Sequence, residues 1–392
     1  MLKHDNRWMG LALTLVLRMV ALASAGEQVH LLRTPEGGLQ PQALMDGSGT
    51  LHLVYLKGEP AACDVFYVRR APGQTNFSSP LRVNSRPRSA VAMGTVRGAQ
   101  MAVGRDRRIH VAWNGSASAN AGHGEGEPMF YTRLNDAGDG FEPERNLMTS
   151  TTHLDGGGSV AADALGNVYV AWHGHAKSGP QDEQHRGVFV ARSRDDGKTF
   201  TPEIQADRPR VGACSCCGLK AMTDHRGRLA ILYRSANAER SRDATLLVSK
   251  DHGASFDSKV LGSWRVPMCP MSTHALAQGP GDALLALWET QGQIYHELVS
   301  PERMSSAAAG LATEGSGGRC KHPAVAVSLS KAGGRLLMVW TENTAWAKGG
   351  SLAWEWIDLQ TGEKGSGRAG GVPAWSFAAA VAERDGSFAI IY

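Results

Sequence analysis

The stretch Gly158–Phe200, GSVAADALGNVYVAWHGHAKSGPQDEQHRGVFVARSRDDGKTF, contains the unit that the rest of the chain repeats. An alternating run, Ser159–Ala162, reaches a turn at Asp163–Gly166, and a second run, Val168–Trp172, leads back and ends on an aromatic residue. After a polar insert, Gly187–Arg192 forms a third run. Runs of four to six residues bounded by Gly, Asp and Asn, without helical periodicity, predict an antiparallel β-meander.

The second run of this unit recurs along the whole chain, and its copies end 52 to 61 residues apart. The copies are Leu51–Tyr55, Ile109–Trp113, Val168–Trp172, Leu229–Tyr233, Leu284–Trp288, Leu336–Trp340 and Phe388–Tyr392. A long period built from short strands is typical of β-propeller blades, and we assign the extra length to inserted loops. The sequence therefore predicts an all-β, seven-bladed β-propeller, with a six-bladed ring as the alternative.

The two ends of the repeat array predict how the ring closes. The last copy ends at Tyr392, and the alternating run Val29–Arg33 has no partner of its own nearby. We expect this N-terminal strand to complete the blade begun by Ser376–Tyr392, because closure removes free sheet edges.

The first 25 residues have the features of an export signal. Lys3 and Arg7 precede the apolar stretch Trp8–Leu17, and Ala23–Ala25 forms an A-x-A cleavage site. Arg18 interrupts the apolar stretch, so we expect no spanning helix. Residues 26–392 are then a single propeller domain of an exported protein, either periplasmic or secreted.

Composition narrows the range of partners. The net charge is +4, of which the signal region contributes +2, and no basic run occurs. Nucleic acid is therefore not an expected partner, and we expect a monomer that binds a glycan or another small ligand at the mouth of the propeller channel.

A polar turn follows the third strand of the unit and recurs one period later. Ser193–Phe200 reads S-x-D-x-G-x-T-F, and Ser249–Phe256 repeats the pattern 56 residues on. We expect Ser and Asp side chains to bind turn amides, Gly to adopt a positive φ, and the aromatic residue to fill space between sheets. The residues concerned are Ser193, Asp195, Gly197, Thr199, Phe200, Ser249, Asp251, Gly253, Ser255 and Phe256.

These two turns resemble the Asp box, or BNR repeat, of sialidase-type β-propellers. The resemblance implies that the boxes are structural and lie on the side away from the functional site. It also implies an arginine triad, a Tyr–Glu nucleophile pair, an Asp acid/base and a Phe/Tyr-Arg-Ile/Leu-Pro motif near the first strand. Here the matching segment Leu39–Gln42 has Gln40 in place of the arginine, and no Tyr–Glu pair can be assigned from spacing. The resemblance favours a glycan-binding or glycan-processing protein, whereas these departures argue against sialidase catalysis.

Three arginines and a tryptophan are candidates for binding substrate. Arg210, Arg265 and Arg319 precede the inner strands of blades four, five and six. They either line one site for a carboxylate or sulfate group or are ordinary loop residues. Trp346 lies in a loop that could hold a sugar.

The cysteines and several histidines fall before inner strands or in loops between second and third strands, which open on one face of a propeller. The candidates are Cys214, Cys216, Cys217, Cys269, Cys320, His274 and His322. An even number of cysteines in an exported protein is compatible with disulfides between blades. Alternatively, these residues form a copper or zinc site, or a redox site.

Three functional classes remain open at this level. The chain is a glycan-binding or glycan-processing protein, a soft-metal or redox propeller that uses its Cys/His rim, or a scaffold for another exported protein. If it is an enzyme, a sialidase-like glycoside hydrolase is the expected type. Fold alone does not decide among the three classes.

Overall fold

The structure is a computed structural model that describes residues 28–94, 96–116, 127–207, 211–237, 241–266, 268–304, 310–314, 318–330 and 333–392. The expected export signal lies outside these residues. In the described part of the chain, no helix has the length and apolar character needed to cross a membrane.

Seven sheets follow one another along the chain. Blade 1 consists of β2 (Leu39–Met45), β3 (Leu51–Glu59), β4 (Ala62–Arg70) and β5 (Leu81–Arg82), and blade 2 of β6 (Gln100–Val103), β7 (Ile109–Asn114), β8 (Met129–Arg133) and β9 (Arg145–Asn146). Blade 3 consists of β11 (Ser159–Ala162), β12 (Val168–Ala176), β13 (Gly187–Ser193) and β14 (Ile204–Gln205), with β10 (Thr151–Thr152) beside β12.

Blades 4 to 7 complete the ring. Blade 4 consists of β15 (Lys220–Thr223), β16 (Leu229–Arg234), β17 (Ala244–Ser249) and β18 (Asp257–Gly262), and blade 5 of β19 (Ala275–Gln278), β20 (Leu284–Thr290), β21 (Gln293–Val299) and β22 (Leu311–Ala312). Blade 6 consists of β23 (Cys320–Ser330), β24 (Gly333–Glu342), β25 (Gly350–Asp358) and β26 (Lys364–Val372). Blade 7 consists of β27 (Ala379–Ala382), β28 (Phe388–Ile391) and β1 (Val29–Leu32). The predicted seven-bladed all-β propeller is confirmed, and the six-bladed alternative is wrong.

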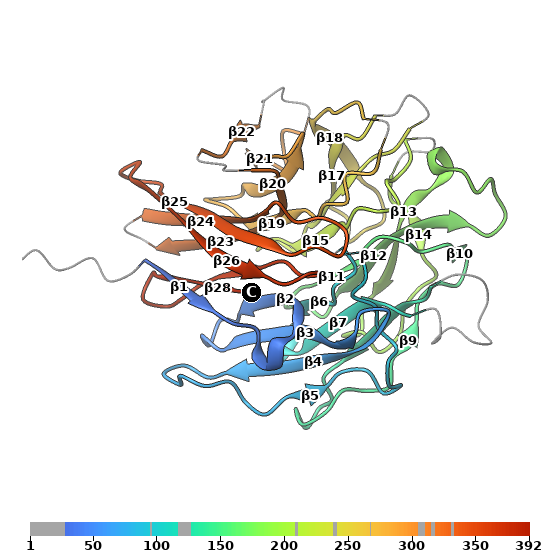
Figure 1. Cartoon of the computed structure of the whole chain (residues 1–392). Coiled ribbons are helices and arrows are strands. Elements are labelled where there is room, and N and C mark those ends of the chain that lie inside the picture. The colour runs from blue at the N-terminus through green and yellow to red at the C-terminus, as the bar shows by residue number, and fades with distance from the viewer. Residues whose placement is uncertain are drawn as a thin grey trace, which may run out of the picture.

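The ring closes through its two ends. The strand β1 pairs with β28 in parallel register from Val29 opposite Phe388 to Leu32 opposite Ile391. Figure 1 shows the two strands side by side. The amide of Thr34 also donates to the carbonyl oxygen of Tyr392 at 3.0 Å. The predicted closure by the N-terminal strand is therefore confirmed.

The core lies between neighbouring blades. The aromatic residues that end the second strands are almost completely buried: Tyr55, Trp113, Trp172, Tyr233, Trp288 and Trp340. Each buries on the order of 150–250 Å² on folding, so these rings contribute much of the apolar contact between sheets. The recurring aromatic position that reveals the repeat in the sequence is thus a packing position.

The antiparallel strand order places different loops on the two faces of the ring. Each blade begins with its inner strand, so the connections from one blade to the next and the loops between second and third strands lie on one face, which we call the channel mouth. The turns between third and fourth strands lie on the opposite face. The inner strands of all seven blades surround a cavity of about 730 Å³.

The two S-x-D-x-G-x-T/S-F turns lie on the face opposite the mouth. The carboxylate of Asp195 accepts from the amide of Thr199 at 2.9 Å and from its hydroxyl at 2.6 Å. Asp251 has the corresponding bonds with Ser255 at 2.9 and 2.6 Å. Phe200 packs edge-on against Tyr131 of blade 2, with ring centroids 4.8 Å apart. The turns therefore join third strands to neighbouring blades.

Candidate functional site

An arginine at the channel mouth contacts two carboxylates. Arg97 precedes β6, and its guanidinium pairs with Asp155, which precedes β11. The Nη1 atom of Arg97 lies 3.8 Å from Oε1 of Glu127, and its Nε atom donates to the carbonyl oxygen of Asp155 at 2.7 Å. Asn114 holds the same loop, because its amide donates to the carbonyl oxygens of Asp155 and Gly156.

The two carboxylates have different surroundings. Burial raises the pKa of Glu127, and the negative charge of Asp155 adds to this effect, whereas Arg97 opposes it. The Oε2 atom of Glu127 is buried and has no hydrogen-bond partner among the described residues. The Asp155 side chain is 40% exposed. A carboxyl group with a raised pKa beside an exposed carboxylate is the arrangement that acid–base catalysis uses.

Two tryptophans lie beside this group. Trp346 is 56% exposed and packs edge-on against Trp375, with ring centroids 4.9 Å apart. A Cβ atom placed on Gly94 would lie 3.6 Å from the Trp346 ring and 4.0 Å from Nη1 of Arg97. The aromatic pair and the Arg97 group are therefore neighbours at the mouth.

Four of the six cysteines gather at the mouth beside the loop that carries Asp155, where a Cβ atom placed on Gly156 would meet the carbonyl oxygen of Cys217. The Sγ atoms of Cys214 and Cys216 are 3.6 Å apart, and those of Cys214, Cys216 and Cys217 all lie within 4.8 Å of one another. Cys214, Cys269 and a carboxylate oxygen of Glu183 also lie within 4.8 Å of one another. None of the six cysteines, all of which the structure describes, is in a disulfide bond, so the structure contains none of the expected disulfides. We call Cys214, Cys216, Cys217 and Cys269 the thiol cluster.

The thiol cluster is surrounded by charged side chains. Burial opposes ionisation of Cys217, but hydrogen bonds from Cys214 and Cys216 and the charge of Arg234 lower the pKa of its thiol well below the usual value. Hydrogen bonds from Cys214 and Cys216 likewise lower the pKa of Cys269. These shifts favour ionisation of Cys217 and Cys269, whereas the pKa values of Cys214 and Cys216, which donate to them, are raised.

Histidines support the cysteine loop without joining the cluster. His173 binds the carbonyl oxygen of Cys217 at 2.6 Å, and His274 binds that of Gly218 at 2.7 Å. Burial lowers the pKa of each to about 4, so both imidazoles are neutral at pH 7. Because each binds a carbonyl oxygen, His173 carries its proton on Nε2 and His274 on Nδ1.

Two of the predicted ligands lie apart from the thiol cluster. Cys320 is fully buried in the apolar core between blades 5 and 6, and its Sγ atom lies 3.4 Å from the carbonyl oxygen of Gly318. His322 is buried against Phe377, with ring centroids 5.8 Å apart. Neither these two nor His274 is among the described groups close enough to share an ion. The expectation that all seven residues form one ligand set is wrong in this respect.

Part of the predicted arginine site falls outside the described residues. Arg210 lies outside them, and Arg265 and Arg319 are exposed. The mouth also has four basic residues that spacing did not single out: Arg97, Arg186, Arg234 and Arg242. The sequence position of Arg97 and Asp155 could have identified them, because both precede inner strands, as the cysteines do.

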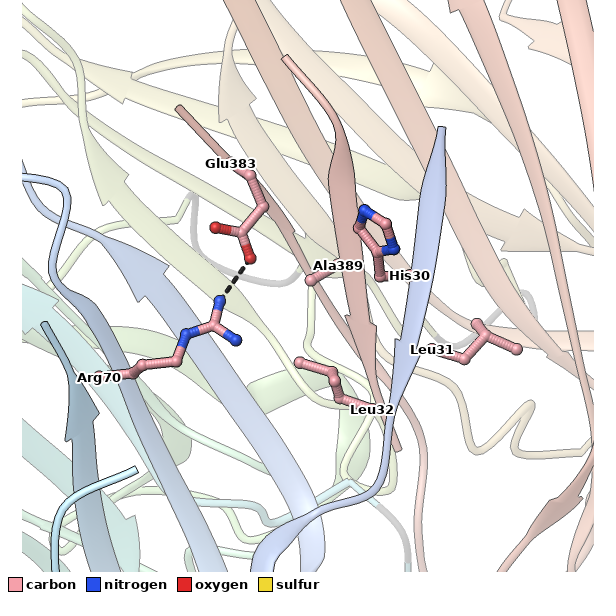
Figure 2. A pocket seen from close by; sticks show the side chains of 6 residues that line it. All are labelled: His30, Leu31, Leu32, Arg70, Glu383 and Ala389. Carbon is pink, nitrogen blue, oxygen red and sulfur yellow. Dashed lines mark hydrogen bonds and ion pairs between the residues drawn. The ribbon is translucent and has the colours of Figure 1, made fainter. Parts of the chain in front are cut away.

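A second hollow lies where the ring closes (Figure 2). It is about 460 Å³ in volume and is lined by His30, Leu31, Leu32, Arg70, Glu383 and Ala389. Arg70 pairs with Glu383 at 2.5 Å across it. Its one carboxylate is thus neutralised, and it offers fewer reactive groups than the mouth.

Comparisons with known proteins extend to the fold. No family model and no curated protein matches the chain. Among solved structures, an α-L-arabinanase of Penicillium chrysogenum complexed with arabinobiose is similar, with a TM-score of 0.52, 12% identity and coverage of 83% of this chain and 94% of that one. An α-L-arabinofuranosidase of Fusarium graminearum in complex with an iminosugar inhibitor has a TM-score of 0.50 and 10% identity, with coverage of 80% of this chain and 92% of that one. A Hadza microbial sialidase has a TM-score of 0.47 and 13% identity, with coverage of 82% of this chain and 69% of that one.

These neighbours are glycoside hydrolases, and at such low identity the likeness shows the fold alone. The fold is a β-propeller of the kind found in glycoside hydrolases.

Proposed function

We infer that the chain is an exported carbohydrate-active protein whose glycan-binding site is the Arg97 side of the channel mouth. One observation carries this proposal: Arg97 joins a half-buried carboxyl group, Glu127, to an exposed carboxylate, Asp155, beside a pair of tryptophans of which Trp346 is exposed. The fold supports it, because the similar arabinanase is complexed with arabinobiose and the similar arabinofuranosidase with an iminosugar.

Each part of this site has a chemical role with a sugar. The exposed face of Trp346 stacks against the apolar face of a sugar ring. Arg97 and Asp155 bind hydroxyl groups through charge-assisted hydrogen bonds. Glu127, whose pKa is raised by burial, donates its proton to the glycosidic oxygen of the departing group. Water then adds its hydroxyl group to the anomeric carbon and gives its remaining proton to Asp155.

Binding is tested first with a panel of neutral and acidic oligosaccharides that includes arabino-oligosaccharides. We expect one or more glycans to bind, and Trp346→Ala to raise the dissociation constant about tenfold, equivalent to roughly 1.4 kcal/mol. Leu165→Ala is the matched control, since Leu165 is 73% exposed in a turn on the opposite face. Absence of glycan binding, or equal losses in the two variants, would rule out this site.

Hydrolysis is tested with chromogenic glycosides of the sugars that bind. Glu127→Gln is expected to lower kcat at least a hundredfold while leaving the dissociation constant within a few-fold. We expect no turnover of simple α-sialosides, because Gln40 replaces the arginine of the sialidase-type motif. A Glu127→Gln variant with full activity would exclude this residue as the acid.

A further inference from the structure

The thiol cluster is built from two blade connections that are fastened to each other. Cys214, Cys216 and Cys217 lie in the connection from β14 to β15, and Cys269 lies in that from β18 to β19. The amide of Gly218 donates to the carbonyl oxygen of Ser272 at 3.1 Å, which joins the two connections next to the cysteines. His173 and His274 bind the carbonyl oxygens of Cys217 and of the next residue, Gly218. The thiols are thus held by packing and by backbone hydrogen bonds from several blades.

The spacing of the sulfur atoms suits a shared ion. In a tetrahedral site with metal–sulfur bonds of about 2.3 Å, neighbouring sulfur atoms are about 3.8 Å apart. The Cys214–Cys216 separation of 3.6 Å is close to this value and far longer than a disulfide bond of about 2.05 Å. Cys214 and Cys217 have the C-x-x-C spacing, and the amide of Cys217 donates to the carbonyl oxygen of Cys214 in a tight turn.

The surrounding charges are suited to a negatively charged cluster. Four cations interact electrostatically with the thiols: Arg186, Arg234, Arg242 and Lys321. Two of them have a carboxylate nearby, since Arg242 pairs with Glu183 at 2.7 Å and Arg234 lies 3.8 Å from Glu289. These six residues therefore carry a net charge of +2 when all are ionised. Zinc(II) bound by four thiolates, or copper(I) bound by three, has a charge of −2 and neutralises this surplus.

We propose that the thiol cluster binds one thiophilic d10 metal ion, copper(I) or zinc(II), and so clamps the connections that lead into blades 4 and 5. Three of the sulfur ligands come from one loop, and Cys269, the exposed cysteine of the cluster, completes a four-thiolate set from the next blade. Zinc needs all four ligands for tetrahedral coordination, whereas copper(I) is satisfied by three. This proposal does not depend on glycan binding.

The test uses the full chain, reduced and freed of metal with a chelator. Zinc(II) and copper(I) are titrated separately, zinc against a chromophoric chelator and copper(I) against a copper(I)-specific chelator. We expect one equivalent of ion per chain, and a loss of at least a hundredfold in affinity in the Cys214→Ser/Cys217→Ser variant. Cys63→Ala is the matched control, since Cys63 is a buried thiol in the core of blade 1.

The variant Cys269→Ser separates the two ions. Zinc affinity should fall at least a hundredfold in this variant, because zinc needs four thiolates, whereas copper(I) affinity should stay within a few-fold, because three thiolates suffice. A large loss of affinity for both ions would also support the proposal and would show that both use Cys269. Equal affinity in Cys214→Ser/Cys217→Ser and in the unmodified chain would overturn it, as would failure of both ions to bind the unmodified chain.

A second measurement needs no substitution. Cys269 is exposed and Cys216 is partly exposed, so both should react with an alkylating agent in the metal-free chain. We expect the bound ion to protect both thiols and a chelator to restore their reactivity. Unchanged alkylation in the presence of the ion, or peptides joined by a disulfide between Cys269 and residues 214–217 in protein isolated without reductant, would overturn the proposal.

Discussion

The side-chain amide of Gln40 donates a hydrogen bond to the main-chain carbonyl oxygen of Trp375 at 2.8 Å. The same amide nitrogen also binds the carbonyl oxygen of Ala92, and the backbone amide of Gln40 donates to the hydroxyl of Ser376 at 3.0 Å. Gln40 is fully buried and has a positive φ of 51°. At the position where the sialidase-type motif has an arginine, this chain therefore has a glutamine, Gln40, that holds the backbone of Trp375 at the channel mouth.

Replacing Gln40 with alanine should weaken both stability and glycan binding. The carbonyl groups of Trp375 and Ala92 lose their donor, and we expect the free energy of unfolding to fall by about 1–3 kcal/mol. Gln42→Ala is the control, because Gln42 is equally internal but binds Met101 on β6. Chemical denaturation should show similar losses in both variants, whereas titration with glycan should show a weaker dissociation constant in Gln40→Ala alone. Equal effects on binding would contradict a supporting role for Gln40.

The Asp195 turn should affect stability and leave glycan binding unchanged. Asp195→Ala removes the acceptor for the amide and hydroxyl of Thr199, so we expect a loss of roughly 1–3 kcal/mol in unfolding free energy. Asp106→Ala serves as the control, because the Asp106 side chain is 89% exposed in a turn on the same face. Loss of glycan binding in a folded Asp195→Ala protein would show that this turn takes part in the site.

The same turns predict how stability depends on acid. Burial would raise the pKa of Asp195, but hydrogen bonds from Thr199 and Ser193 lower it to about 2 from 3.8. In Asp251, hydrogen bonds led by that from Ser255 lower the pKa to about 2 as well. Because both pKa values are lower in the folded chain, their contribution is complete above about pH 4 and is lost as the pH falls toward 2. Denaturation between pH 5 and pH 2 should show a shallower decline in Asp195→Asn/Asp251→Asn; parallel curves would contradict this.

Topology explains how much of the site was predictable from sequence. Once the repeat is recognised, any residue just before an inner strand must lie at the channel mouth, which places Cys214–Cys217 and Cys269 on one face. The fold itself was predictable for the same reason, since the buried aromatic positions recur at blade period. The resemblance to Asp boxes implied that these turns lie away from the functional site, and the strand order places them opposite the mouth.

Local backbone geometry explains what the sequence could not show. The pairing of β23 with β24 shifts between Lys321 and Ala324, and His322 has a positive φ of 51°. Such a bulge redirects the neighbouring side chains, so Cys320 joins the apolar core and not the thiol cluster. The corresponding shift in β2 falls between Leu39 and Gln42, where Gln40 turns inward. Spacing gives the face on which a residue lies, but it does not give the direction of its side chain at a bulge.

Removal of the closing strand should destabilise the whole ring. A chain that starts at residue 34 lacks β1 and leaves β28 with an unpaired edge, so we expect unfolding free energy to fall by several kcal/mol. It also loses the stacking of Arg33 on Tyr392, where the guanidinium lies 4.0 Å from the ring centroid. A chain that starts at residue 28 is the control. Thermal unfolding at equal temperatures in the two truncated chains would contradict closure by this strand.

Glu127 should make the folded chain more sensitive to alkaline pH. Burial first, and then the charge of Asp155, raise the pKa of Glu127 above its usual value of 4.5. A carboxyl whose pKa is raised on folding stabilises the folded chain while it is protonated, and this contribution is lost as the pH rises through the folded-state pKa. Glu127→Gln keeps the shape and cannot ionise, so its unfolding free energy should exceed that of the unmodified chain by more at pH 8 than at pH 4. Glu142→Gln is the control, because the Glu142 side chain is 36% exposed and pairs with Arg133.

If Glu127 is the proton donor in glycoside hydrolysis, kcat should also decline as the pH rises over the same interval, since only the protonated carboxyl donates. A Glu127→Gln variant whose stability follows that of the unmodified chain at every pH would remove the basis for assigning this residue as the acid.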